Sequence, residues 1–170
     1  MKNIPYLKAV GSIMYLAMAT PPDMRYAAGT LARFSSNPRL EHWTVVKHFL
    51  CYLQGTANHA HTYSLDYMTN ESFMTFSDAN HGRCKDSGRS TSGYILKIGT
   101  RAVIWSSKLQ GIVTLSSTKV EYSTTIEAGT EICWMRSLLL EISFKNNTPS
   151  SLHIDNKSTI QVAKDPEHHV

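Results

Sequence analysis

The spacing of apolar residues changes between residues 55 and 70, and this change constrains the fold more than any other feature. Before it, apolar side chains recur every three or four residues, which is typical of amphipathic helices. After it, short runs rich in β-branched and aromatic residues alternate with turns, which is typical of strands. The chain of 170 residues is therefore expected to form two regions of different architecture.

The first region is predicted to be a small unit of three helices. Pro21 and Pro22 end the first helix, and Pro38 follows the second, because proline cannot continue a helix. Asp23 is expected to cap the second helix, and Gly55 to terminate the third. The core-facing stripes are predicted to be Leu7, Val10, Gly11, Met14 and Ala17, then Met24, Ala27, Ala28, Leu31 and Phe34, and finally Trp43, Val46, Leu50 and Leu53.

The second region is predicted to follow an α/β order. Three β-prone runs, near residues 72–77, 94–98 and 101–107, lie close enough in sequence to form a meander. Helical spacing then returns over residues 118–142, and a fourth strand over 151–155 leads into a short helix. This order predicts a mixed sheet of three strands, a helix, a strand and a helix.

Charge and cysteine content narrow the class of protein further. Lysine and arginine outnumber the acidic residues 17 to 13, and the net charge of +4 favours polyanionic partners. The three cysteines show no Cys-x-x-Cys spacing, so neither a disulfide framework nor a zinc cluster is expected, and a reducing compartment fits. The apolar run over residues 10–19 is too short to cross a bilayer, so no membrane partner is expected.

Three carboxylates are placed where ligands usually bind. Asp78 and Asp155 end the first and fourth predicted strands, at the edge of the sheet that commonly carries ligands in α/β proteins. Glu121 lies on the apolar face near the start of the long helix. A buried carboxylate is costly without a partner, and oxygen ligands are those that Mg²⁺ prefers. The three acids are therefore candidates for one magnesium site.

Each acid also has a structural interpretation that the sequence leaves open. Thr118 and Glu121 match the spacing of a capping box, Asp155 could cap the helix that follows it, and Asp78 could stabilise a turn. Three converging carboxylates would repel one another without bound cations. Convergence in space therefore separates the two interpretations.

Several motifs together resemble one known family. SDAN (77–80), RSTSGY (89–94), WSSK (105–108), LSSTKVEY (115–122) and LHIDNKS (152–158) occur in the order and approximate spacing of the Ty/copia class of retrotransposon Pol polyprotein. They look like its ribonuclease H domain, whereas residues 6–23 and 41–56 look like the helical end of its reverse transcriptase. The resemblance implies a reverse transcriptase end over residues 1–60 and a ribonuclease H-like domain over 70–170.

The resemblance also implies a reaction. In that family the acids matching Asp78, Glu121 and Asp155 are catalytic and bind two Mg²⁺ ions, with Mn²⁺ as an alternative ion. The family's ribonuclease H domain hydrolyses the RNA strand of an RNA–DNA hybrid, and the reaction needs no protein nucleophile. The implied partners are the hybrid and the rest of a reverse transcriptase, in a cytoplasmic retrotransposon particle or the nucleus.

Four further residues are candidates for nucleic-acid binding. Ser117 and Thr118 precede Glu121 and could contact the backbone or minor groove of the hybrid, although helix capping is an equal alternative. Arg89 and Lys157 lie near the acids in sequence and could meet phosphates, although a solvated surface position is the commoner fate of one basic residue.

The sequence departs from the family pattern in three respects. Lys119 and Val120 stand before Glu121, where the family usually has Glu-Ala. Asn80 and His81 stand where the family usually has Asp-Trp, and the sequence ends at Val170, before the family's closing segment with a fourth metal-site acid. The resemblance therefore implies a domain truncated at its C-terminus. Two hypotheses follow: a two-metal nuclease, and a catalytically dead remnant that at most binds nucleic acid or packs against a protein.

Overall fold

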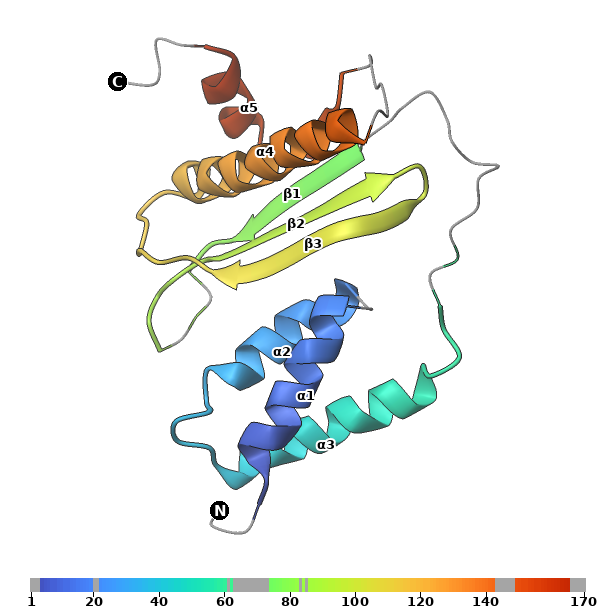
Figure 1. The fold of residues 1–170 in the computed structure, drawn as a ribbon. Coiled ribbons are helices and arrows are strands. Elements are labelled where there is room, and N and C mark those ends of the chain that lie inside the picture. Colours follow the sequence, from blue (N-terminus) through green and yellow to red (C-terminus); the bar gives the residue numbers. More distant parts are fainter. Residues whose placement is uncertain are drawn as a thin grey trace. The chain divides into compact units, whose positions relative to one another are not determined.

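The computed structural model describes residues 4–19, 22–60, 62, 74–82, 84, 86–142 and 149–165. The chain divides into two compact units, residues 1–62 and 63–170, the first helical and the second built on a sheet (Figure 1). Within the described residues, none of the helices combines the length and the hydropathy that a membrane span requires.

The first unit contains α1 (Tyr6–Ala19), α2 (Arg25–Ala32) and α3 (Leu40–Gly55), with a short 3₁₀ turn at Pro22–Met24. The three predicted helices are therefore present. The Tyr6 hydroxyl donates a 2.8 Å hydrogen bond to the Leu31 carbonyl and so joins α1 to α2. The core of this unit consists of Tyr6, Val10, Ile13, Ala17, Met24, Ala28, Leu31, Val46 and Phe49.

Two details of the predicted helices are wrong. The predicted stripes differ from the buried ones at three points, because Leu7, Gly11 and Leu50 are exposed. The buried residues there are Tyr6, Ile13 and Phe49. Asp23 does not cap α2, since the 3₁₀ turn places Met24 at the cap position. The Asp23 carboxylate instead accepts a hydrogen bond from the Tyr52 hydroxyl of α3.

The second unit contains β1 (Met74–Asn80), β2 (Thr91–Ile98), β3 (Arg101–Leu109), α4 (Ser117–Glu141), β4 (Ser151–Ile154) and α5 (Lys157–Lys164). The strands lie in the order β3-β2-β1-β4. β1 to β3 form an antiparallel meander, and β4 pairs with β1 in parallel. The predicted α/β order and mixed sheet are therefore confirmed.

The long helix α4 covers one face of this sheet (Figure 1). Its core side chains Ile132 and Met135 pack with Leu96 of β2. Thr75 is the partner of Leu96 across the ladder and therefore faces α4 as well, since directly paired residues share a face. Asp78 lies three residues farther along β1, near the end of the strand, and is exposed.

Candidate metal centre

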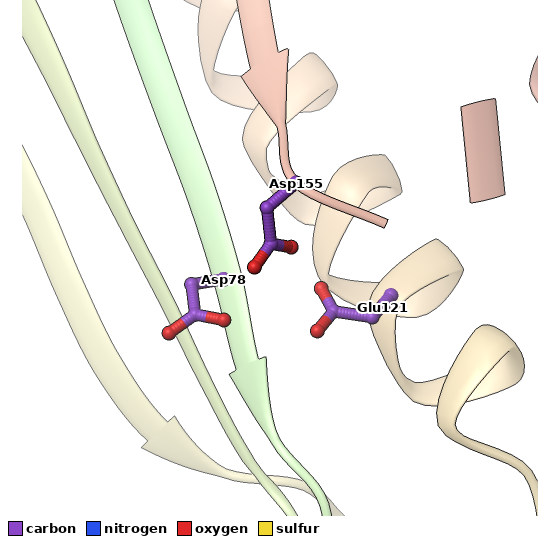
Figure 2. A group of neighbouring side chains, drawn as sticks. All are labelled: Asp78, Glu121 and Asp155. Carbon is purple, nitrogen blue, oxygen red and sulfur yellow. The ribbon is translucent and has the colours of Figure 1, made fainter. Parts of the chain in front are cut away.

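Strand pairing places two of the predicted acids next to each other. Ser77 of β1 pairs with Ile154 of β4 in parallel register, so the next residue on each chain segment is an aspartate, Asp78 and Asp155. Glu121 approaches them from the second turn of α4. Figure 2 shows the three carboxylates pointing toward one another from β1, the end of β4 and α4.

The distances between these carboxylates suit a shared cation. Each residue offers one carboxylate oxygen, and the three oxygens lie within 4.8 Å of one another. Asp78 and Asp155 are exposed, whereas Glu121 is only 7% exposed. A set of three carboxylate oxygens is typical of Mg²⁺ and Mn²⁺ sites rather than of softer metals.

Glu121 is the acid whose charge is the most costly to maintain. Burial raises the pKa of its carboxyl, the negative charges of Asp78 and Asp155 raise it further, and a hydrogen bond with the Ala79 backbone opposes this shift. Its Oε2 atom is buried and has no hydrogen-bond partner among the described residues. A buried acceptor without a partner destabilises the fold. The residues present therefore fit a divalent cation, which would neutralise the group and occupy the free oxygen.

The structural interpretations of the three acids are wrong. The cap residue of α4 is Ser116, so Thr118 and Glu121 do not form a capping box. The cap residue of α5 is Asn156, whose side chain accepts a 3.0 Å hydrogen bond from the Thr159 N–H. Asp78 lies within β1, opposite Gly93, and not in a turn.

The four residues predicted to bind nucleic acid lie at the starts of α4 and α5 and just before β2. Ser117 is exposed at the first position of α4, and Thr118 is half-buried at the second. Neither is the cap residue, so capping does not account for them. Arg89 is exposed just before β2, and Lys157 is exposed at the first position of α5. Their contact with nucleic acid stays a prediction.

Sequence reasoning missed two contributors to this region. The Ala79 backbone bonds to Glu121, and the buried side chain of Gln110 bonds to Ser92 and to the Val120 carbonyl. The contribution of the Ala79 backbone could not be predicted from the sequence, because every residue except proline has the same backbone N–H group. Gln110 follows a strand directly, where a polar residue is ordinary, so only its burial reveals it.

Three relatives span the chain to different extents. Secreted RxLR effector protein 161 of Plasmopara viticola is 44% identical over 137 residues, which are 79% of this chain and 94% of that protein. The retrovirus-related Pol polyprotein from transposon TNT 1-94 of Nicotiana tabacum is 34% identical over 169 residues, which are 99% of this chain and 12% of the polyprotein. The corresponding polyprotein from transposon RE1 of Arabidopsis thaliana is 37% identical over 164 residues, which are 96% of this chain and 11% of the polyprotein.

The chain thus spans most of the Plasmopara protein but only about a ninth to an eighth of the two plant polyproteins. No protein-family model and no solved structure matches it.

Proposed function

Because the chain belongs to the Pol polyprotein family of copia-type retrotransposons, we propose that its second unit is a ribonuclease H domain. This domain hydrolyses the RNA strand of RNA–DNA hybrids with two divalent cations. The helical first unit is then the end of the reverse transcriptase. The partners are the hybrid and, within a polyprotein, the remaining reverse transcriptase.

The convergence of Asp78, Glu121 and Asp155 is the observation that carries this proposal. Their oxygens lie within 4.8 Å of one another, although the residues come from three elements far apart in sequence. The order of three antiparallel strands, a helix, a parallel strand and a helix supports a ribonuclease H-like fold. The buried Oε2 of Glu121 has no hydrogen-bond partner among the described residues, and a bound cation would satisfy it.

The chemistry divides between the cations and the protein. When bound, divalent cations activate a water and stabilise the charge on the departing 3′ oxygen of the RNA. The water oxygen would bond to phosphorus as the P–O3′ bond breaks, with the water proton lost to solvent and a proton taken up by O3′, which leaves a 5′-phosphate and a 3′-hydroxyl. The three carboxylates hold the cations. Asp78 and Asp155 are exposed and so face the substrate, whereas buried Glu121 is fixed by its bond with the Ala79 backbone.

The surrounding polar residues are proposed to recognise the hybrid. Ser117 and Thr118 lie at the same end of α4 as Glu121, where their hydroxyls can meet the sugar–phosphate backbone and the 2′-hydroxyls that distinguish RNA. The exposed cations Arg89 and Lys157 would contact phosphates, which fix the register of the substrate without reading its sequence.

The test is cleavage of an end-labelled RNA–DNA hybrid in Mg²⁺ by the parent chain and by Asp78→Asn. We expect the variant to lose at least about a hundredfold in rate, because it removes a charge from the group that holds the cations. The matched control is Asp86→Asn, which makes the same change at an exposed acid outside the cluster and should cleave like the parent. Equal cleavage by the parent and Asp78→Asn contradicts the proposal.

A catalytically inactive nucleic-acid-binding remnant is the second candidate. It is favoured by Asn80 and His81, which replace the Asp-Trp pair usual in the family. This candidate predicts that the parent binds the hybrid with an affinity that falls as salt rises, but does not cleave it in Mg²⁺ or Mn²⁺. Cleavage that depends on Asp78 excludes it.

A further inference from the structure

A cluster of buried polar side chains lies beneath the first turns of α4, outside the carboxylate group. Its members Ser90, Ser92, Gln110 and Thr124 are each at most 7% exposed. Buried polar groups persist in folded proteins when they are hydrogen-bonded. Here the hydrogen bonds connect the sheet to the helix that carries Glu121.

Gln110 is at the centre of this cluster. Its side-chain Nε2 donates to the Ser92 hydroxyl at 2.9 Å and to the Val120 carbonyl at 3.3 Å, and it lies 3.5 Å from the Thr124 hydroxyl. Its backbone N–H donates to the Ser90 carbonyl at 2.8 Å, which fixes the residue itself. The Thr124 hydroxyl completes the cluster, 2.8 Å from the Ser92 hydroxyl.

The Gln110 contacts reach both the helix segment that carries Glu121 and the strands to which Glu121 bonds. Val120, whose carbonyl accepts from Gln110, directly precedes Glu121 in α4. Ser92, the other partner, pairs in the β-ladder with Ala79, whose backbone bonds to the Glu121 carboxylate. The Gln110 amide therefore connects α4, which carries Glu121, to the pair of strands β1 and β2, whose Ala79 backbone bonds to the Glu121 carboxylate.

We infer that Gln110 is a positioning residue that keeps Glu121 directed at Asp78 and Asp155. This inference rests on the metal site of the proposed function. The negative charges of Asp78 and Asp155 repel Glu121, so the start of α4 needs an anchor that resists its displacement before a cation binds. The Gln110 amide supplies that anchor. Groups that orient metal ligands commonly change metal affinity by about ten- to a hundredfold when they are removed.

The test uses Mn²⁺ as the probe and the full chain as the protein. Gln110→Met keeps the length of the side chain and removes the amide donors. We expect it to weaken Mn²⁺ binding, measured by calorimetry or electron paramagnetic resonance, by about tenfold. The matched control is Tyr94→Phe, which removes another hydrogen bond between the sheet and α4, the 3.0 Å bond to Glu131 three turns farther along the helix.

A merely structural role for Gln110 predicts that both variants lower the unfolding temperature and that neither changes Mn²⁺ affinity. Parent-like Mn²⁺ affinity in Gln110→Met therefore overturns the inference, as does an equal loss of affinity in Tyr94→Phe. If Gln110→Met does not fold, Thr124→Val takes its place, with about a threefold loss expected because it removes the Thr124 hydroxyl but leaves the bonds from Gln110 to Ser92 and Val120. Its control is Thr130→Val, which removes an equivalent hydroxyl bond to the helix backbone at an exposed position of α4.

The failure of this inference is distinguishable from the failure of the proposed function. A parent chain that binds Mn²⁺ but does not cleave the hybrid overturns the proposed function and leaves the Gln110 comparison intact. A parent chain that does not bind Mn²⁺ overturns both.

Discussion

At the scale of single residues, Glu121 combines burial with two negative neighbours. Without a cation this arrangement destabilises the fold, so Glu121→Gln should stabilise the metal-free chain by about 1 kcal/mol, a rise of a few degrees in the unfolding temperature. Added Mn²⁺ should raise the unfolding temperature of the parent and not that of the variant, because only the parent keeps the full ligand set. Thermal unfolding in EDTA and in Mn²⁺ measures both effects. A variant that is less stable than the parent in EDTA contradicts this account of Glu121.

Substitutions at the adjacent residues Asp155 and Asn156 distinguish metal binding, the role proposed for Asp155, from helix capping, the role of Asn156. Asn156→Ala removes the bond to the Thr159 N–H and should lower the free energy of unfolding by about 1 kcal/mol, with Mn²⁺ affinity unchanged. Asp155→Asn should show the opposite pattern, a loss of Mn²⁺ affinity with little loss of stability. Denaturant unfolding together with Mn²⁺ titration distinguishes the two, and interchanged results would show that Asp155 serves the helix.

Residue-level prediction from sequence was accurate for which acids meet and inaccurate for which residues cap. Asp78 lies near the end of β1, Asp155 directly follows β4, and Glu121 lies in the second turn of α4. The order of these elements brings the three acids together. Capping depends on where a helix begins to within one residue, and periodicity does not give that position. The sequence offered Asp155 as the cap of α5, whereas the helix begins one residue later and Asn156 caps it.

At the scale of elements, Tyr94 joins β2 to α4 and should make their contact sensitive to alkali. Burial and its hydrogen bond to Glu131 raise the pKa of Tyr94 to about 12, above the value near 10 of an unfolded chain. Its stabilising contribution is therefore complete below pH 10 and is lost as the pH rises to about 12. Tyr94→Phe should show a flatter decline of unfolding temperature over that interval. Parallel declines in the two proteins would contradict this role.

Helix faces were predictable only to within one residue. In α1 the apolar Leu7 fits the stripe as well as Tyr6 does, and in α3 Leu50 competes with Phe49. Packing selected the aromatic residues, which bury more surface, and the Tyr6 hydroxyl found a partner in α2. Gln110 was not predictable, because its side-chain partners are 10 to 18 residues away in sequence and follow no periodic pattern.

At the scale of the whole molecule, the two units have separate cores that share no residue. A protein consisting of residues 70–170 should therefore fold and bind Mn²⁺ with the affinity of the full chain, because the three acids and Gln110 all lie within it. Circular dichroism and Mn²⁺ titration of that protein provide the check. A loss of Mn²⁺ affinity in the shorter protein would show that the helical unit contributes to the site.

The parallel pairing of β1 with β4 also governs when the site can form during synthesis. Two strands, a long helix and their connections leave the ribosome before β4 can reach β1. Contacts between segments so distant in sequence are late events in folding. The set of three carboxylates is therefore complete only after Asp155 has been synthesised, so a nascent chain in which β4 is still inside the ribosome lacks the complete ion site.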